Sequence, residues 1–280
     1  DKSNANVLIL GNSGQGKSHL LKLLLINILE SGKRAICLDP EGEYREITEA
    51  LGGSYLDLTG GRYRINVLEP RMWSAEEKEP DPEAPAAFQS GSLLSQHIAF
   101  LRDFFRSYKP FTEAEIDTIE IMLGRLYDSR GLRDDTDYSR LSPQDYPILS
   151  DLYDQMDAEY QRVRAGSGGE LYTPELLRSA CLGLHSMCKG ADSKFFNGHT
   201  NIRDTRLITF GVKDLMEGGK NIKDAMLFNV LSYINHALIA GGSTAGVFEE
   251  LHVFLSNPVA VSYIRSAMKR VRKRDSLIGL

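Results

Sequence analysis

A glycine-rich loop that ends in a lysine and a serine is the strongest chemical signal in the sequence. Residues 11–18 read Gly-Asn-Ser-Gly-Gln-Gly-Lys-Ser, and an apolar run at residues 7–10 precedes them. Glycines let a backbone wrap closely around a phosphate, and the amides of residues 14–19 would point at it from a helix N-terminus. Lys17 would reach the β- and γ-phosphate oxygens, and Ser18 would bind Mg²⁺. The pattern predicts a nucleoside triphosphate site; the alternative is a plain glycine turn between a strand and a helix.

The residues assigned to nucleotide binding form one uninterrupted stretch. They are Gly11, Asn12, Ser13, Gly14, Gln15, Gly16, Lys17, Ser18 and His19. Lys17 also receives a catalytic role, because a lysine in this position neutralises charge on the transferred phosphoryl group.

Two adjacent acids could complete a hydrolytic site. The run Ser-Thr-Ala-Gly-Val-Phe at residues 243–248 predicts a strand, and Glu249 and Glu250 follow it directly. We assign Glu249 to the magnesium side and Glu250 to the general base that orients and deprotonates the attacking water. The first position is usually Asp, so the extra methylene of Glu249 could shift its carboxylate by about a bond length. The alternative is two ordinary acids at a strand end, and His252 is equally open between a γ-phosphate sensor and a structural histidine.

Three further acids follow a second predicted strand. Residues 34–38, Arg-Ala-Ile-Cys-Leu, predict a buried strand, and Asp39, Glu41 and Glu43 come directly after them. A strand, a helix and a second strand with this spacing predict a parallel sheet, and ligands bind beyond the carboxyl ends of such strands. Each of the three acids could therefore hold Mg²⁺ through water or position the attacking water. The alternative is a solvated acidic turn that caps the helix predicted at residues 44–51.

A basic cluster lies at the end of a helix predicted at residues 259–273. Its members are Arg265, Lys269, Arg270, Arg272, Lys273 and Arg274. Three interpretations stay open: a cationic helix C-terminus that the helix dipole favours, a nucleic-acid contact through residues 265–274, and an arginine finger offered to a neighbouring subunit. We favour the finger and assign it to Arg272, for which the expected gain in rate is about 10³- to 10⁵-fold.

Composition describes an ordinary globular protein. Of the 280 residues, 25% are charged and 42% are hydrophobic, and the net charge of −5 argues against a surface that binds nucleic acid everywhere. Three cysteines without a C-x-x-C pair predict reduced thiols in a cytosolic protein. No apolar run reaches the roughly 18 residues that a membrane span needs. The sequence starts directly before a strand and stops inside another, so we expect a piece of a larger protein.

The pattern of elements predicts an α/β core with an all-helical insert. Short strands are expected at residues 54–58 and 64–67 with a hairpin turn between them, and a second hairpin is expected at residues 195–202. Further helices are expected at 19–29, 92–105, 112–126, 148–163 and 173–189 and in a long segment that ends before residue 241, and a further strand is expected at 207–212. We assign residues 1–70 and 170–280 to the core, and residues 71–169 to a flexible linker, rich in Pro and Glu, and the helical insert.

Five motifs in order carry a resemblance to a known family. They are residues 11–18, Asp-Pro-Glu-Gly-Glu-Tyr at 39–44, Ile-Asn-Val-Leu-Glu-Pro at 65–70, Phe-Asn-Gly at 196–198 and Glu-Glu-Leu-His at 249–252. Together they resemble the large ATPases of conjugative-transfer (type IV secretion) systems, which belong to the FtsK/HerA-like branch of RecA-fold motors. The first motif is common among nucleotide-binding proteins, whereas the second and fourth in this order are much more specific.

The resemblance implies a RecA-like P-loop NTPase core with a mainly parallel sheet flanked by helices, and ATP with Mg²⁺ as ligands. It also implies oligomers whose sites are shared between subunits, a hexamer being one active form, with secretion-channel components as partners. The expected location is the cytoplasmic side of the cell membrane, peripheral to its inner face. We expect a motor that powers pilus or channel assembly and substrate transfer. The alternatives are a DNA-translocating or coupling ATPase of the same branch and a nucleotide-gated assembly module with little hydrolysis.

Overall fold

The fold is taken from a computed structural model of the chain. It describes residues 6–7, 9–10, 14–71, 92–168, 171–216, 219–240, 243–250, 261 and 277–279. No helix within these ranges combines the length and the apolar character needed to cross a membrane.

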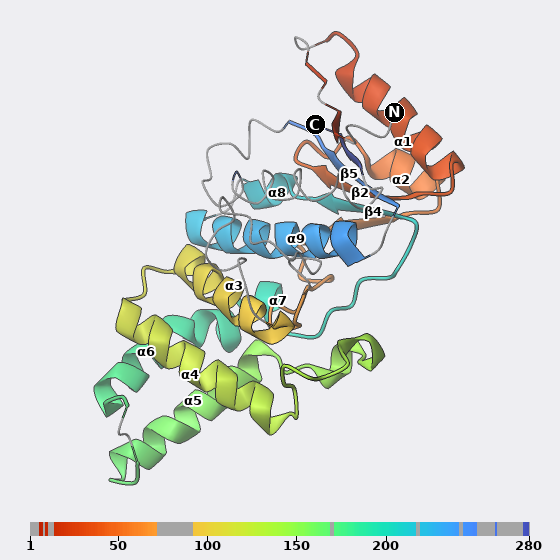
Figure 1. The fold of residues 1–280 in the computed structure, drawn as a ribbon. Helices are drawn as coiled ribbons and strands as arrows, with labels where there is room; N and C mark the ends of the chain where they lie inside the picture. The colour runs from red at the N-terminus through yellow and green to blue at the C-terminus, as the bar shows by residue number, and fades with distance from the viewer. Residues whose placement is uncertain are drawn as a thin grey trace.

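A parallel sheet forms the upper part of the molecule in the view of Figure 1, between α1 and α9. Its strands in the described part of the chain are β1 (Asn6–Val7), β2 (Arg34–Asp39), β3 (Ser54–Asp57), β4 (Leu207–Gly211), β5 (Thr244–Phe248) and β6 (Leu277–Gly279). Their order across the sheet is β1-β6-β5-β2-β4-β3, and all neighbouring pairs are parallel. The carboxyl ends of β2 and β5 therefore meet at one edge, where the predicted acidic residues follow them.

Helices cover both faces of this sheet, and further helices form a layer beyond it. The helices of the described residues are α1 (Lys17–Glu30), α2 (Arg45–Ala50), α3 (Leu93–Tyr108), α4 (Glu113–Ser129), α5 (Leu149–Arg164), α6 (Pro174–Cys188), α7 (Ser193–Phe196), α8 (Lys213–Met216) and α9 (Lys220–Ala240). Two short 3₁₀ turns, η2 (Tyr138–Arg140) and η3 (Pro143–Asp145), lie between α4 and α5.

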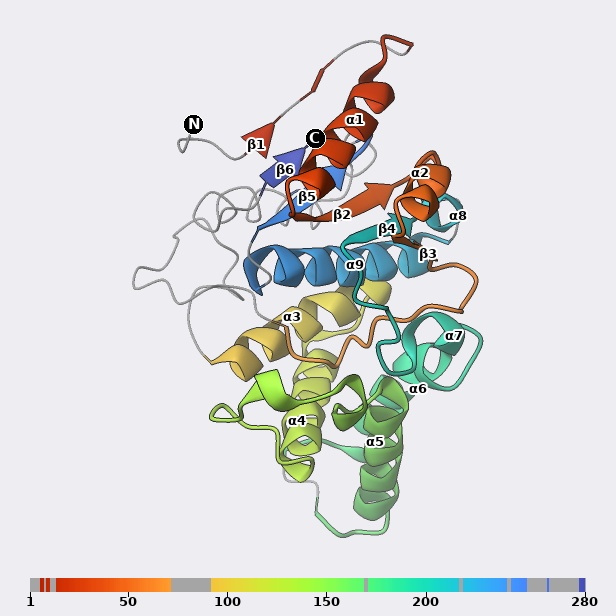
Figure 2. The same cartoon turned by 90° about the vertical axis from the view of Figure 1, so that its right-hand side faces the viewer.

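Strand alternation divides the apolar side chains of the sheet between two layers. Successive side chains of a strand point to opposite faces. In β2, Ala35 and Cys37 accordingly join a small cluster with residues of α1, whereas Ile36 and Leu38 join the large core that contains α9. Figure 2 shows α1 and α2 on one side of the sheet and α9 on the other.

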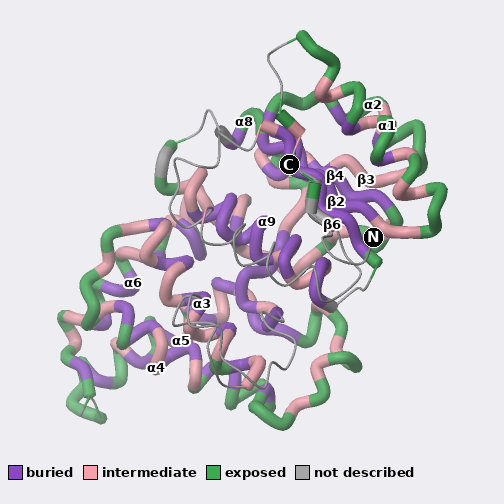
Figure 3. Tube along the Cα trace, turned by 45° about the horizontal axis from the view of Figure 1, so that its top comes forward, coloured by how far each residue is buried: buried purple, intermediate pink, exposed green. Residues whose placement is uncertain are grey.

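The helical part stacks outward from α9. Helix α3 packs on α9, and α4, α5 and α6 pack against one another beyond it (Figure 2). Buried side chains run without a break from the sheet through α9 and α3 into this part, as the burial colours show (Figure 3). Helix α6, which the predicted division assigns to the core, contacts α4 and α5. The division at residues 71 and 169 stays a prediction.

Local signals account for the helix starts. Thr112 caps α4 and forms a capping box with Glu115, and Thr173 caps α6 with Pro174 in the first turn. The predicted strands at 34–38, 54–58, 207–212 and 243–248, and the predicted helices up to residue 240, are confirmed within a few residues at each end. The helix predicted at 259–273 lies outside the described residues except for Val261.

The strand predicted at residues 64–67 is wrong. This segment is an extended loop, and side chains from distant parts of the chain hold its backbone. The Arg64 N–H donates to Asn201 Oδ1 at 2.7 Å, and the Asn66 N–H donates to Thr200 Oγ1 at 3.0 Å. Side-chain acceptors thus replace the partner strand that a hairpin would have supplied, and a local sequence pattern does not reveal them.

The hairpin predicted at residues 195–202 is also wrong. Helix α7 occupies Ser193–Phe196 instead, and Phe196 is buried against the rings of Phe104 and Tyr108. Asn197 Oδ1 accepts from the Ser150 N–H at 2.9 Å. The Asn-Gly pair therefore ends a helical turn that is locked onto the helical part, because burying the aromatic ring decides the local backbone here.

Candidate functional site

The glycine-rich loop leads into α1 in the way its pattern predicts. Gly14 and Gly16 have φ values of 80° and 81°, a left-handed conformation that glycine adopts without steric penalty. Helix α1 begins at Lys17, and within the described residues no side chain caps it and no acid lies in its first turn. The positive end of the helix dipole is thus left for an anion. Lys17 and Ser18 are half-buried and His19 is exposed.

Register brings Glu249 to the same face as α1. Leu38 of β2 pairs with Phe248 of β5, and the Glu249 N–H continues the ladder to the Leu38 carbonyl oxygen at 3.4 Å. Glu249 has the same parity along the strand as Val247, which packs in the α1 cluster. Strand β6 lies between β1 and β5. The two halves of the candidate site therefore start about 10 Å apart, two strand spacings.

Ser18 and Glu249 nevertheless meet across this gap. A side-chain hydrogen bond from Ser18 lowers the pKa of Glu249, so the two residues assigned to magnesium lie within reach of each other. Glu249 is 5% exposed, and its Oε2 has no hydrogen-bond partner among the described residues. Burial raises the pKa of Glu249 above its usual value, against the lowering effect of Ser18; Glu43 and Asp39 raise the pKa further.

The donor set fits Mg²⁺. This ion prefers oxygen ligands, usually keeps several waters, and is commonly held by one or two carboxylates together with substrate phosphates. A hydroxyl and a buried carboxylate with one free oxygen supply that chemistry. No group of three or more His, Cys, Asp or Glu side chains within the described ranges could hold a metal by itself.

Glu250 stands at an unusual backbone position. Its φ is 50°, in the left-handed region, which disfavours a side chain by about 1–2 kcal/mol per residue. The chain thus turns sharply directly after Glu249, and Glu250 is half-buried at the edge of the sheet. Backbone strain of this kind often occurs at functional sites. The assignment of Glu250 as general base stays a prediction.

Asp39 is engaged by its own loop. Its Oδ1 accepts from the N–H groups of Gly42 and Glu43 at 2.8 and 3.1 Å, and its Oδ2 accepts from the Tyr44 N–H at 3.0 Å and the Tyr55 hydroxyl at 3.2 Å. These four bonds shape residues 40–44. Asp39 is fully buried, and the geometry favours a role in building the loop over direct contact with a metal.

The other two acids of this loop are exposed. Glu41 has no ion pair within the described residues, whereas Glu43 Oε2 lies 3.7 Å from Lys22 Nζ. The Lys22 ammonium also lies 5.3 Å from the centre of the Tyr44 ring. No role in the site was predicted from the sequence for Lys22 or Tyr44. The signal for Lys22 was present, because it lies one helical turn after Ser18 and so shares its face.

Several predicted site residues fall outside the described part of the chain. These are Gly11, Asn12, Ser13, His252, Arg272 and Lys273. Their predicted roles, and the basic cluster at 265–274, stay predictions.

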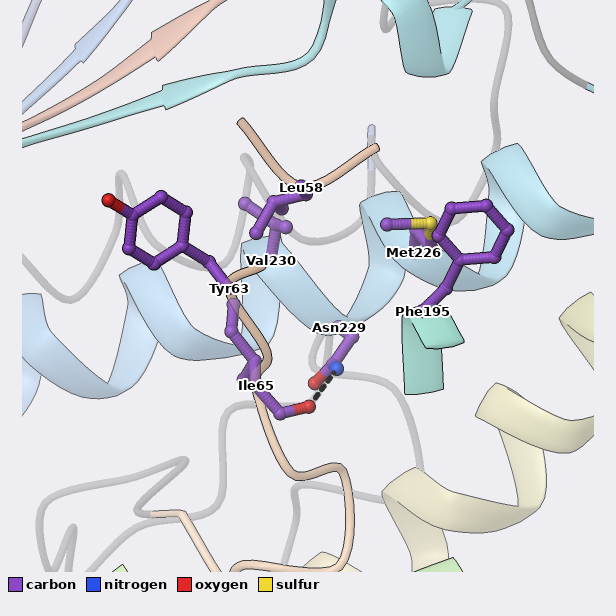
Figure 4. Close-up of a pocket in the computed structure, with 7 residues that line it drawn as sticks. All are labelled: Leu58, Tyr63, Ile65, Phe195, Met226, Asn229 and Val230. Atoms are coloured by element: carbon purple, nitrogen blue, oxygen red, sulfur yellow. Dashed lines mark hydrogen bonds between the residues drawn. The ribbon is translucent and has the colours of Figure 1, made fainter. Parts of the chain in front are cut away.

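A hollow on the other side of the sheet has a different character (Figure 4). It holds about 220 Å³ of space, which includes open solvent, and it is lined by Leu58, Tyr63, Ile65, Phe195, Met226, Asn229 and Val230. None of these seven lining residues is charged. The one amide among them is occupied, because Asn229 donates to the Ile65 carbonyl at 2.8 Å and accepts from Arg71. The hollow is smaller than usual ligand pockets and offers no charge to a phosphate.

The geometry defines a class of protein: a parallel α/β sheet with a glycine-rich turn before a helix and an acidic strand end at the same edge. Comparison with known proteins identifies the family. The chain belongs to the family described as helicase HerA, central domain, whose model matches residues 4–170. The resemblance to the conjugative-transfer and type IV secretion ATPases of the FtsK/HerA-like branch is confirmed.

A solved structure and two curated proteins are similar to this chain. The structure of VirB4 of Thermoanaerobacter pseudethanolicus matches with a TM-score of 0.80 and 31% identity, over 99% of this chain and 69% of that chain. Protein TraC of Escherichia coli is 37% identical over 107 residues, which are 38% of this chain and 12% of TraC. An uncharacterized protein of Bacillus anthracis is 25% identical over 260 residues, 89% of this chain and 40% of that protein.

These matches confirm the predicted fold class, a RecA-like α/β core flanked by helices. The matched regions span less than half the length of the two curated relatives.

Proposed function

We propose that this chain is the ATP-hydrolysing motor domain of a conjugation or type IV secretion system, which powers pilus or channel assembly and substrate transfer. The observation that carries the proposal is the hydrogen bond between Ser18 and Glu249. It joins the phosphate-binding turn to the acidic strand end, the two parts that a triphosphatase needs in one place. Membership of the HerA family and the likeness to VirB4 support the same activity.

Each residue has a distinct task in the proposed reaction. The amides at the start of α1 and the Lys17 ammonium hold the β- and γ-phosphates and offset the charge that builds up on them. Ser18 and Glu249 would hold Mg²⁺, which when bound would offset negative charge on the phosphates. Glu250 accepts a proton from the attacking water and orients it in line with the leaving group. Asp39 keeps the acidic loop in place beside this site.

Assembly and location follow from the family as parts of the same proposal. Arg272 would reach the nucleotide of a neighbouring subunit as an arginine finger, so the active form would be an oligomer with shared sites. The oligomer would work at the cytoplasmic face of the membrane with components of the secretion channel. Mixing Arg272→Ala subunits with Lys17→Ala subunits should restore some active interfaces, and a mixture without any recovery would contradict the finger.

ATP hydrolysis by the wild type and two variants tests the activity. Lys17→Ala should lose ATP binding and hydrolysis together, because it removes the charge that contacts the phosphates. Glu250→Gln should keep ATP binding and lose about 10²- to 10⁴-fold in the single-turnover hydrolysis rate, the usual contribution of a general base. Glu46→Gln, an exposed acid in the first turn of α2, is the matched control and should behave like the wild type.

Two outcomes would contradict the proposal in different ways. Equally slow hydrolysis by the wild type and Glu250→Gln, with ATP still bound, would identify a nucleotide-gated assembly module instead of a motor. A hydrolysis rate that rises strongly with added DNA and falls with salt would favour the DNA-translocating alternative.

A further inference from the structure

Tyr44 is a buried side chain at the candidate site that the proposed reaction does not yet use. It ends the acidic loop directly before α2 and is 1% exposed. Its ring packs in the cluster between α1 and the sheet, together with Leu21, Cys37 and Val247. Its N–H donates to Asp39 Oδ2 at 3.0 Å, so the loop fixes where the ring enters this layer.

Two polar atoms in this layer lack a partner. The Tyr44 hydroxyl and Glu249 Oε2 are buried, and neither has a hydrogen-bond partner within the described residues. Buried polar atoms in folded proteins are nearly always bonded, so an orphaned donor and an orphaned acceptor at one site need an explanation. A phenol supplies a donor and an ionised carboxylate oxygen supplies an acceptor. The two atoms are therefore chemically complementary.

The two groups also belong to the same layer of the structure. Tyr44 contacts the cluster that contains Val247, and Val247 lies two residues before Glu249 on the same face of β5. Burial raises the pKa of Tyr44 well above its usual value, and among the neighbouring ionisable groups Glu249 raises it most. The phenol thus keeps its proton at physiological pH and stays a donor.

We propose that Tyr44 is a positioning residue for Glu249: when Mg²⁺ and nucleotide bind, its hydroxyl donates a hydrogen bond to the free carboxylate oxygen, directly or through one water. Ser18 already bonds the carboxylate, so the second bond would fix its orientation toward magnesium. Lys22 lies 5.3 Å from the centre of the ring and pairs with Glu43, which holds the ring from the α1 side. This inference rests on the proposed function, because it assigns Glu249 to the metal.

Tyr55 provides a matched control from the same neighbourhood. Its hydroxyl donates to Asp39 Oδ2 at 3.2 Å, so it already has a partner. Tyr55→Phe removes a bond that the nucleotide-free protein makes, and it should lower the unfolding midpoint. Tyr44→Phe keeps the buried ring and removes a hydroxyl that has no partner, so its unfolding midpoint without nucleotide should be equal to or above that of the wild type.

The test measures ATP binding by calorimetry across a Mg²⁺ titration, and separately in EDTA. Tyr44→Phe should need about tenfold more Mg²⁺ for half-maximal ATP binding, the effect of one lost hydrogen bond to a charged group. Its ATP affinity in EDTA should equal that of the wild type, and Tyr55→Phe should keep the wild-type Mg²⁺ dependence. In a Glu249→Ala background, which has no side-chain acceptor at this position, Tyr44→Phe should have no further effect, because the two residues act as one unit.

The failure of this inference is separable from the failure of the proposed function. If the wild type binds ATP no better than Lys17→Ala, the nucleotide site itself is wrong. If the wild type binds ATP and Tyr44→Phe shows an unchanged Mg²⁺ dependence, the site stands and the role of Tyr44 is refuted. An equal effect of Tyr44→Phe with and without the Glu249 carboxylate would also overturn it.

Discussion

Two buried charges, Glu249 at the edge of the sheet and Arg71 beside α9, are treated differently by the fold. Arg71 is 3% exposed, and its guanidinium donates to Asn229 Oδ1, Ser232 Oγ and the Asn66 carbonyl at 2.8, 2.9 and 2.6 Å. Glu249 is similarly buried, but one of its carboxylate oxygens has no hydrogen-bond partner among the described residues. The first charge donates to three neutral acceptors, whereas the second leaves one acceptor atom unused, as expected of a group that awaits a ligand.

The setting of Arg71 shows what its network does. Asn66 donates from its side chain to the Pro147 carbonyl at 2.9 Å, and Tyr127 donates to the Leu68 carbonyl at 2.7 Å. These bonds tie the loop at residues 65–71 to the helical part on one side and to α9 on the other. The network therefore joins the sheet layer to the helices, and its role is to stabilise the fold.

Replacing Arg71 should give the largest effect on stability. Arg71→Met keeps much of the side-chain volume but removes the donor of three buried hydrogen bonds, so the free energy of unfolding should fall by about 3 kcal/mol. Arg133→Met is the control, because Arg133 pairs with Asp128 on the surface, and its loss should stay below about 1 kcal/mol. Urea unfolding measures both. Equal losses for the two variants would mean that the buried network adds nothing beyond a surface pair.

His97 should give the next effect, as a function of pH. It is fully buried and stacks on Phe100 with ring centres 5.5 Å apart. Burial lowers its pKa well below the usual value, and Arg71 and His236 lower it further. Below about pH 6.5 the unfolded chain takes up a proton that the folded state refuses, so stability should fall with decreasing pH by up to about 1.4 kcal/mol per pH unit.

The comparison variant for His97 is His97→Phe, which keeps an aromatic ring in the same place. Urea unfolding between pH 7 and pH 5 should show a slope that is shallower than that of the wild type. If the two proteins lost stability with pH at the same rate, the acid sensitivity would come from groups other than His97.

Glu249 should show the opposite and smaller pH effect. Its pKa is raised by burial, so its folded value lies above the value of about 4.3 for an unfolded chain. Between these two values the folded state holds the extra proton, and stability should fall as the pH rises. The free energy of unfolding of the wild type, relative to that of Glu249→Gln, should therefore fall as the pH is raised from 4. A difference that is constant with pH would show that the carboxylate is well solvated.

The sequence predicted the elements whose signals are local. The capping box at Thr112 and Glu115 and the proline at 174 mark helix starts, and the apolar runs that became β2, β4 and β5 mark buried strands. The two predicted hairpins are wrong because contacts with distant residues determine the backbone conformation of those segments. Asn201 supplies hydrogen bonds to one, and the buried ring of Phe196 forces a helical turn in the other.

The same distinction between local signals and distant contacts holds at the candidate site. The glycine-rich turn and the parity that turns Glu249 toward α1 follow from local pattern and strand alternation. The saturation of Asp39 by the N–H groups of its own loop and the burial of Tyr44 beneath α1 do not, because both depend on how the loop folds back on the sheet. The catalytic roles assigned to Lys17 and Glu250 stay predictions.

The thermal unfolding midpoint of Glu249→Gln, relative to the wild type and with and without Mg²⁺ and ATP, tests the central claim most directly. A buried carboxylate oxygen without a hydrogen-bond partner lowers the stability of the ligand-free protein. Without ligand, the variant should therefore unfold at a higher temperature than the wild type. With Mg²⁺ and ATP the order should reverse, because the wild type gains the stabilisation of a tightly bound ligand. If the unfolding midpoint of the variant is higher than that of the wild type in both conditions, Glu249 does not bind the metal, and the account of this site is wrong.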